Sequence, residues 1–240
     1  MPIATLIAAD SSESGLISEA CDRLVASGCT IGNISWIEQG KAVDIQFEGS
    51  TSDARAALSR LESYNDIAIQ SSDVRRKMLL VSDMDSTMIV VECIDELADY
   101  AGIKPEIAAI TERAMAGELD FAQALKARVA LLAGLDEKVI AQCLAERVRT
   151  MPGAETLVRT MVGWGAHAVL VSGGFTRFTD PVAELLGFTE VHANVLEIRD
   201  GALTGALVGD IVDASTKRDV LLTAGLAKGL AVDDVLAVGD

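Results

Sequence analysis

The stretch that decides the fold is "VSDMDSTMIV", residues 81–90. It continues the apolar run Met78-Leu79-Leu80, and together they predict a short buried strand that ends near Asp83. Asp83 and Asp85 stand two residues apart at that end, and carboxylates this close repel each other. We therefore expect the end of this strand to hold a group that offsets the repulsion.

The composition limits the classes of protein that fit. Half of the 240 residues are apolar, so the chain can bury a substantial core in one or two domains. The 20 basic and 36 acidic residues give a formal net charge of −16, which argues against non-specific nucleic-acid binding and against an anionic membrane surface. Two histidines are too few for a histidine-rich metal site.

The same sequence predicts a cytoplasmic location. The four cysteines form no C-x-x-C pair, which in a chain of this length is typical of reduced thiols rather than of a disulfide framework. The opening "MPIATLIAADSSES" lacks a basic region, and no apolar run approaches membrane-spanning length. We expect neither a signal peptide nor a membrane span.

Residues 1–74 are predicted to form a small domain of their own. Alternation and helical periodicity give strand 3–8, helix 14–27, strands 31–38 and 42–48, helix 52–63 and strand 66–70. This βαββαβ order is the ferredoxin-like arrangement. With the opening "DSSESGLI" it resembles the ACT family, whose members often bind amino acids at a dimer interface. The resemblance implies serine binding and a homodimer, and a domain that only dimerises or packs is the alternative.

Residues 88–150 are predicted to be helical throughout. In "FAQALKARVALLAGL", residues 121–135, one face carries a stripe of apolar side chains: Phe121, Ala124, Leu125, Val129 and Leu132. Arg128 falls on the same stripe. A buried guanidinium is costly unless it meets an acid or a bound anion. Alternatively, its stem covers apolar surface while its head reaches water.

Residues 151–240 alternate between helix and strand, which predicts a parallel α/β sheet. Within them, "NVLEIRDGALTGALVG" predicts a hairpin with its turn at Asp200-Gly201. The sequence stops at Asp240, directly after a predicted strand and a glycine. Because most α/β folds cover such a strand with a following helix, we expect the sequence to be incomplete at this end.

Polar residues gather at the predicted strand ends. They are Asp83 and Asp85, then Ser172-Gly173-Gly174, then Lys217 near a helix start, then Asp240. In an open parallel sheet, ligands bind beyond the carboxyl ends of the strands. Three carboxylates can share Mg²⁺, while a hydroxyl, backbone N–H groups of a glycine turn and an ammonium suit a phosphate. The set predicts phosphoryl transfer.

This ordered set resembles the four motifs of the haloacid dehalogenase (HAD) superfamily of phosphatases: "DMDST", "SGG", Lys217 and the terminal "GD". The longer stretches 83–102, 113–135 and "VSGGFT" resemble its phosphoserine phosphatase family. The resemblance implies a Rossmann-like HAD domain over 75–240. Its core would comprise 75–87 and 151–240, and a helical-bundle cap would be inserted at 88–150. It also implies hydrolysis of O-phospho-L-serine to L-serine and phosphate, the last step of serine biosynthesis.

Roles for single residues follow from the resemblance. Asp83 would be the nucleophile that forms an aspartyl-phosphate, and Asp85 the general acid and then the base. The phosphate would be held by Ser172, the N–H of Gly173 and Lys217. Asp83, Asp240 and the backbone carbonyl of Asp85 would bind Mg²⁺.

The resemblance also places the serine head group in the cap. Arg128 would bind its carboxylate and Glu92 its ammonium group, and Met115 and Phe121 would supply apolar walls. The alternative for Glu92 is an ordinary acid in the first turn of a helix. Two alternatives for the chain stay open: a related phosphatase or phosphotransferase acting on another small phosphorylated metabolite, and a non-catalytic amino-acid sensor.

Overall fold

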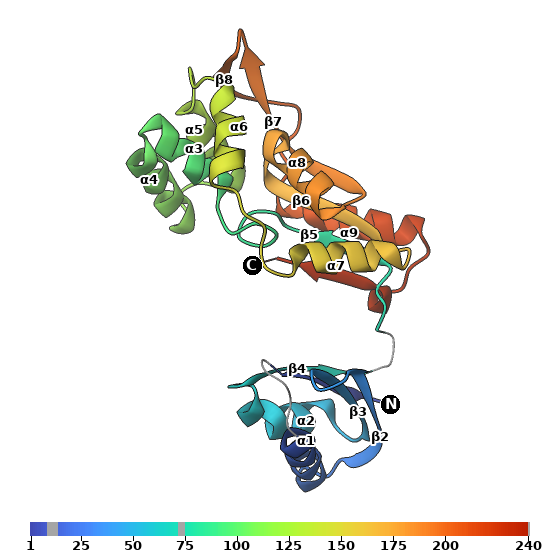
Figure 1. Ribbon diagram of the computed structural model, residues 1–240. Helices are drawn as coiled ribbons and strands as arrows, with labels where there is room; N and C mark the ends of the chain where they lie inside the picture. The colour runs from blue at the N-terminus through green and yellow to red at the C-terminus, as the bar shows by residue number, and fades with distance from the viewer. Residues whose placement is uncertain (9–13, 72–74, 240) are drawn as a thin grey trace. The chain divides into compact units, whose positions relative to one another are not determined.

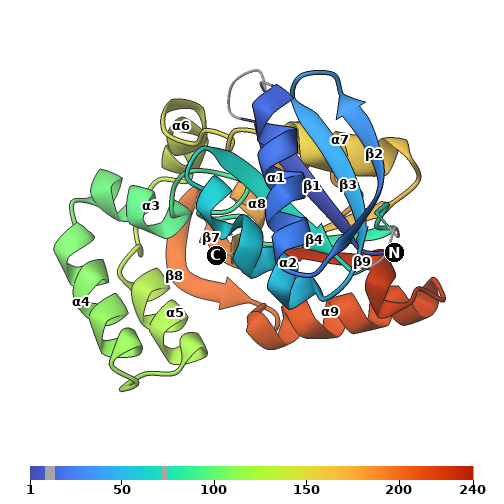
Figure 2. The same cartoon turned by 90° about the horizontal axis from the view of Figure 1, so that it is seen from below.

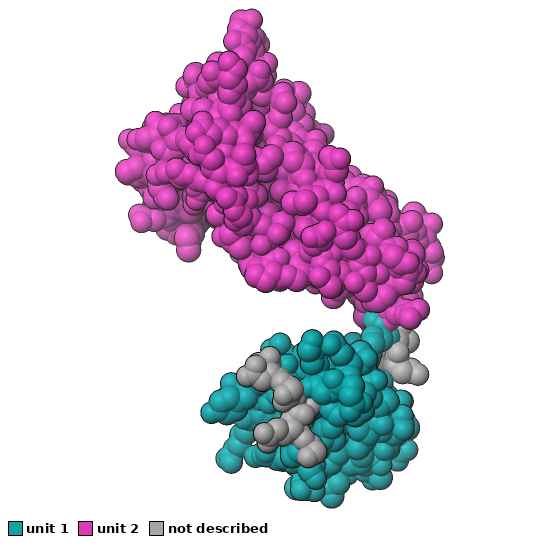
Figure 3. Space-filling view, in the orientation of Figure 1, with its two compact units in different colours: residues 1–75 teal, residues 76–240 magenta. Residues whose placement is uncertain are grey.

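The computed structural model describes residues 1–8, 14–71 and 75–239, and it divides the chain into two compact units, Met1–Arg75 and Arg76–Asp240 (Figure 3). Each unit has its own buried apolar cluster. Asp240, the predicted third metal ligand, lies outside the described residues. All four cysteines are free thiols, as predicted.

Unit 1 is an antiparallel sheet with two helices. Its elements are β1 (Ile3–Ala8), α1 (Ser14–Ala26), β2 (Thr30–Glu38), β3 (Ala42–Glu48), α2 (Thr51–Leu58), the 3-10 turn η1 (Ser59–Leu61) and β4 (Asn65–Gln70). The strand order is β2-β3-β1-β4. The helix expected over 52–63 is divided, because α2 ends at Leu58 and only a 3-10 turn follows. Leu6, Leu24 and Phe47 are at most 1% exposed in its core.

Unit 2 is built on a five-stranded sheet. Its strands are β5 (Leu79–Ser82), β6 (His167–Phe175), β7 (Glu190–Arg199), β8 (Ala202–Val208) and β9 (Val235–Val238), in the order β8-β7-β6-β5-β9. Strands β9, β5, β6 and β7 run parallel, which confirms the predicted parallel α/β sheet. Strand β8 pairs antiparallel with β7.

Helices cover both faces of this sheet. They are α7 (Ala154–Gly163), α8 (Thr176–Leu186) and α9 (Ala214–Ala227), and the 3-10 turn η2 (Val232–Asp234) precedes β9. Alternate residues of β5 point to opposite faces. Leu80 packs in the cluster with Phe178 of α8, whereas Leu79 and Val81 pack in the cluster with Val220 of α9. The short strand β5 is therefore buried on both sides, as "MLLVS" predicts.

A helical segment lies between β5 and α7. It comprises α3 (Cys93–Ala101), α4 (Lys104–Met115), α5 (Phe121–Ala130) and α6 (Lys138–Glu146). Asp120 caps α5 by accepting a hydrogen bond from the Gln123 N–H at 2.7 Å, and the Gln123 side chain accepts from the Asp120 N–H. None of the helices in the described ranges is long and apolar enough to cross a membrane.

Strands β7 and β8 form the predicted hairpin. Asp200 and Gly201 form its two-residue turn, with φ of 54° and 81°. A turn with positive φ at both positions matches the twist of the flanking strands, and Asp-Gly is a favoured pair for it. Both cartoon views show the hairpin beside α5 (Figures 1 and 2).

Candidate active site

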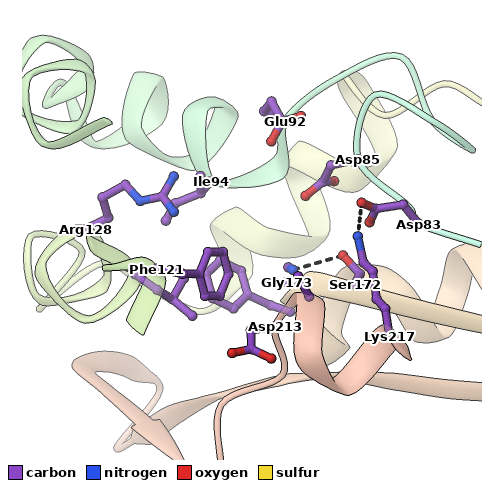
Figure 4. A pocket seen from close by; sticks show the side chains of 14 residues that line it. Asp83, Asp85, Glu92, Ile94, Phe121, Arg128, Ser172, Gly173, Asp213 and Lys217 are labelled. Carbon is purple, nitrogen blue, oxygen red and sulfur yellow. Dashed lines mark hydrogen bonds and ion pairs between the residues drawn. The ribbon is translucent and has the colours of Figure 1, made fainter. Parts of the chain in front are cut away.

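A cavity of about 340 Å³ lies at the carboxyl ends of β5 and β6 (Figure 4). Its lining residues are Asp83, Asp85, Glu92, Ile94, Phe121, Leu125, Arg128, Ser172, Gly173, Gly174, Phe175, Asp213, Ala214 and Lys217. The lining thus includes the residues predicted for catalysis and for substrate binding in the described part of the chain, but not Met115, which was predicted as an apolar wall. In Figure 4, Arg128 and Phe121 lie on one side, and Asp83 and Lys217 lie on the other.

Asp83 directly follows β5, and contacts with β9 and α9 hold it in place. Its N–H donates to the carbonyl of Val238 in β9 at 3.0 Å. Its Oδ1 accepts from the N–H of Met84 at 2.7 Å, and its Oδ2 pairs with Nζ of Lys217 in the first turn of α9. The carboxylate is therefore fixed at the mouth of the cavity, with a cation beside it.

Asp85 is buried more deeply, and its environment differs from that of Asp83. Burial raises its pKa from 3.8 to about 7, an effect that the hydrogen bond from the Cys93 thiol opposes. Its Oδ1 is buried and has no hydrogen-bond partner among the described residues. A carboxyl group with a pKa near neutral can both donate and accept a proton at physiological pH. Asp85 therefore has the properties of a general acid and base.

We expect Asp85→Asn to stabilise the protein at pH 8. The unfolded carboxyl ionises near 3.8 but the folded one near 7, so the folded state holds the extra proton and the parent loses stability as pH rises through this window. Asparagine cannot ionise, so the variant avoids this loss in the free energy of unfolding, on the order of 2–4 kcal/mol. Urea unfolding of both proteins at pH 5 and pH 8, with a chelator present to remove metal ions, measures the difference. The exposed Asp180→Asn is the control, and an advantage that does not grow with pH would contradict the burial of Asp85.

The glycine turn after Ser172 lies against the acids. Ser172 is 1% exposed, and its Oγ accepts from the Gly174 N–H at 2.9 Å. A Cβ at Gly174 would lie 3.1 Å from both Oδ2 of Asp85 and Oγ of Ser172, and one at Gly173 would lie 2.8 Å from the Phe121 ring. A Cβ at either position would therefore require its neighbours to shift, whereas glycine fits as the site stands. With no side chain at Gly173, its N–H can approach an anion closely.

Gly174→Ala should lower kcat/KM about 10- to 100-fold, because its methyl group displaces Asp85 or Ser172 from the positions that the chemistry needs. Steady-state phosphate release measures the effect. Gly163→Ala is the matched control, since a Cβ there meets nothing within 4 Å. It should leave activity unchanged and stabilise the fold by about 0.4–1 kcal/mol. Equal activity of the two variants would show that the close approach at Gly174 does not matter.

Glu92 and Arg128 belong to the helical segment. Glu92 immediately precedes α3 and accepts a hydrogen bond from the Ser86 hydroxyl at 2.6 Å. Arg128 lines the cavity, its Nε is buried with no partner in the described part of the chain, and burial lowers its pKa below the ordinary value. A buried N–H without a partner is costly, so the arrangement favours a guanidinium that binds an anion.

Two features of the cavity differ from the prediction. Met115 does not form a wall, because it is 84% exposed at the end of α4 and the chain turns away after it. Asp213 lines the cavity but was not predicted. It caps α9, accepting from the N–H groups of Ser215 at 2.8 Å and Thr216 at 3.1 Å. The sequence signal was an aspartate just before a helix, and this cap fixes the turn that carries Lys217.

The donors present are compatible with a hard divalent cation. Asp83 offers carboxylate oxygens and Asp85 a backbone carbonyl, and both are oxygen ligands of the kind that such a cation takes. Over the described residues, no group of three or more His, Cys, Asp or Glu side chains is placed to hold a metal ion. Gly239 approaches Asp83, since a Cβ there would lie 3.9 Å from Cβ of Asp83. The next residue, Asp240, is the third carboxylate that the sequence predicts.

The chain matches known proteins over both units. Residues 80–240 match the haloacid dehalogenase-like hydrolase family. A phosphoserine phosphatase of Streptomyces coelicolor is 42% identical over 225 residues, which are 91% of this chain and 55% of that protein. One from Albidiferax ferrireducens is 48% identical over 167 residues, 68% of this chain and 70% of that protein.

Solved structures agree with the sequence matches. The unliganded crystal structure of a probable phosphoserine phosphatase from Vibrio cholerae has a TM-score of 0.79 at 33% identity, covering 98% of this chain and 72% of that one. The chain spans about half the length of the Streptomyces relative. On these matches and the geometry of its cavity, the chain belongs to the haloacid dehalogenase-like hydrolases, in the family of the phosphoserine phosphatases.

Proposed function

We propose that this protein hydrolyses O-phospho-L-serine to L-serine and phosphate through an aspartyl-phosphate at Asp83. One observation carries the proposal: the same cavity holds residues that suit a phosphate and a residue that suits a carboxylate. Asp83 and Lys217 lie at one side, and the buried Nε of Arg128 at the other. The first set suits a phosphate and the second suits a carboxylate. The names of the relatives agree with this substrate.

The reaction divides into two displacements. An oxygen of Asp83 bonds to phosphorus as the bond between phosphorus and the seryl oxygen breaks, and Asp85 gives its proton to that oxygen. Asp85 then takes a proton from water, whose oxygen attacks phosphorus and releases phosphate from Asp83. A pKa of about 7 lets Asp85 serve in both steps. Lys217, Ser172 and the N–H of Gly173 would offset the charge on the phosphoryl oxygens.

Mg²⁺ would be held by Asp83, the backbone carbonyl of Asp85 and Asp240. When bound, it neutralises charge on the phosphoryl oxygens and between the acids. The side chain of Asp85 is then left for proton transfer.

The helical segment would act as a cap that recognises the amino-acid head. Arg128 and Glu92 both line the cavity; Arg128 would make a bidentate pair with the carboxylate, and Glu92 would accept from the ammonium group. Ile94 and Phe121 line the cavity between them and would exclude water from the reacting phosphate. Recognition of both charges would select an amino-acid phosphate over a simple phosphate ester.

Phosphate release from the full chain tests this function. We expect release from phosphoserine that is restored by Mg²⁺ after chelation, and slower release from phosphoethanolamine, which lacks the carboxylate. Equal rates on the two would favour another small phosphorylated metabolite as the substrate. No release from either, with Mg²⁺ present, would favour a non-catalytic sensor.

For unit 1 we propose a ferredoxin-like, ACT-type domain that binds an amino acid such as serine and pairs with a second copy. The order β-α-β-β-α-β and the antiparallel sheet support it. Calorimetry with L-serine on the full-length Arg128→Ala variant would separate unit 1 from the active site. Heat at millimolar serine would support binding, and no heat would leave only the packing or dimerisation role.

A further inference from the structure

Backbone hydrogen bonds join residues 134–137 of the helical segment to the β7–β8 hairpin, and we call these residues the seam. The Gly134 N–H donates to the Leu203 carbonyl at 2.8 Å, and the Leu203 N–H donates to the Leu135 carbonyl at 2.9 Å. The Glu137 N–H donates to the Gly201 carbonyl at 2.9 Å. Residues 134–137 therefore pair with the start of β8 as an added strand would. The chain that follows α5 is tied to the hairpin by its backbone.

Gly205 of β8 brings the hairpin and α5 into direct contact. Its φ is +84°, and a Cβ there would lie 2.9 Å from Cβ of Ala133 and 3.1 Å from the carbonyl oxygen of Ala130. Real Cβ atoms essentially never approach a neighbour below 3.0 Å. A side chain at Gly205 would therefore force either the end of α5 or the hairpin to shift, and the carbonyl that it meets is backbone, which cannot rotate away as a flexible side chain can.

Helix α5 is the element that carries Arg128 and Phe121 into the cavity. Arg128 lies only two residues before Ala130, so a displacement of the helix end moves the guanidinium with it. The phosphate-binding residues are on other elements: Asp83 follows β5, and Lys217 is in α9. A change at the Gly205 contact would therefore alter the distance between Arg128 and the phosphate-binding residues.

We propose that Gly205 and the seam at 134–137 are positioning elements for substrate selection, which set where Arg128 lies relative to the phosphate site. This rests on the proposed function, in which Arg128 binds the substrate carboxylate. A displaced α5 would weaken binding of phosphoserine and spare an aryl phosphate, which has no group for Arg128. Misplacement by about 1 Å can cost up to about 100-fold in rate.

The test is Gly205→Ala with Gly209→Ala as its matched control. Gly209 has φ +81° but nothing within 4 Å of its Cβ, so both variants strain the backbone alike and only Gly205→Ala creates the contact. We expect Gly205→Ala to lower kcat/KM for phosphoserine about tenfold, mainly through KM, and to leave p-nitrophenyl phosphate within about twofold. Gly209→Ala should change neither substrate by more than about twofold.

A second substitution should reverse the effect. Ala133→Gly removes the nearer contact atom, so in the Gly205→Ala background it should restore at least part of the phosphoserine activity. If Gly205→Ala does not fold, Ala133→Val places a larger side chain at the same contact, just after α5. It should lower kcat/KM for phosphoserine relative to kcat/KM for p-nitrophenyl phosphate in the same way. An unchanged ratio, or an equal loss in Gly209→Ala, would overturn the proposal. A parent enzyme inactive on phosphoserine would instead overturn the proposed function.

Discussion

Asp83→Asn is expected to reduce phosphate release from phosphoserine by roughly 10³-fold or more, because an amide cannot form the aspartyl-phosphate. The amide is nearly isosteric, so Ser172 and Asp85 should stay in place. Lys217 loses its ion pair, and a modest change in melting temperature is expected from that loss. Steady-state phosphate release with Mg²⁺ present measures the effect.

Asp180→Asn is the control for the nucleophile. Asp180 is an exposed residue of α8 and does not line the cavity, so its variant should keep the parent rate. If Asp83→Asn retained the parent rate, Asp83 could not be the attacking group.

Arg128→Ala is the second large effect. It should lower kcat/KM for phosphoserine by about 10²- to 10³-fold, since a charged hydrogen-bonded pair to the carboxylate is lost. p-Nitrophenyl phosphate has no carboxylate, so its turnover should stay within about threefold. The ratio of the two kcat/KM values is the measurement, and it does not depend on how much protein is active.

Lys126→Ala tests whether any cation on α5 would behave in the same way. Lys126 lies two residues earlier on the same helix, is exposed, and does not line the active-site cavity. Both substrates should be unaffected by this change. Equal losses on the two substrates in Arg128→Ala would mean that the guanidinium supports the fold of the cavity and does not select the substrate.

Much of unit 2 could be predicted because its signals are local. The run "MLLVS" before Asp83 is apolar on both faces, which is typical of a central parallel strand, and β5 is that strand. The pair Asp200-Gly201 predicts the turn of the β7–β8 hairpin, and the structure has its turn there. Parallel strands bring their carboxyl ends to one edge, so Asp83 and Ser172 could be placed together without knowing the path of the chain between them.

Other features depend on contacts between distant segments and could not be predicted. The raised pKa of Asp85 comes from burial under α3, and a sequence does not show that depth. The exposure of Met115 depends on where α4 ends relative to the cavity. The approach of Gly205 to Ala133 joins residues 72 positions apart, and nothing in either local sequence indicates it.

The most direct test of the central claim is to trap the phosphorylated enzyme. The full chain is mixed with phosphoserine carrying a radioactive phosphate and quenched in acid within the first turnover, and the peptides are then analysed. We predict label on the peptide that contains Asp83, lost on treatment with hydroxylamine and absent from Asp83→Asn. Phosphate release without any labelled peptide, or label on a different residue, would contradict the mechanism.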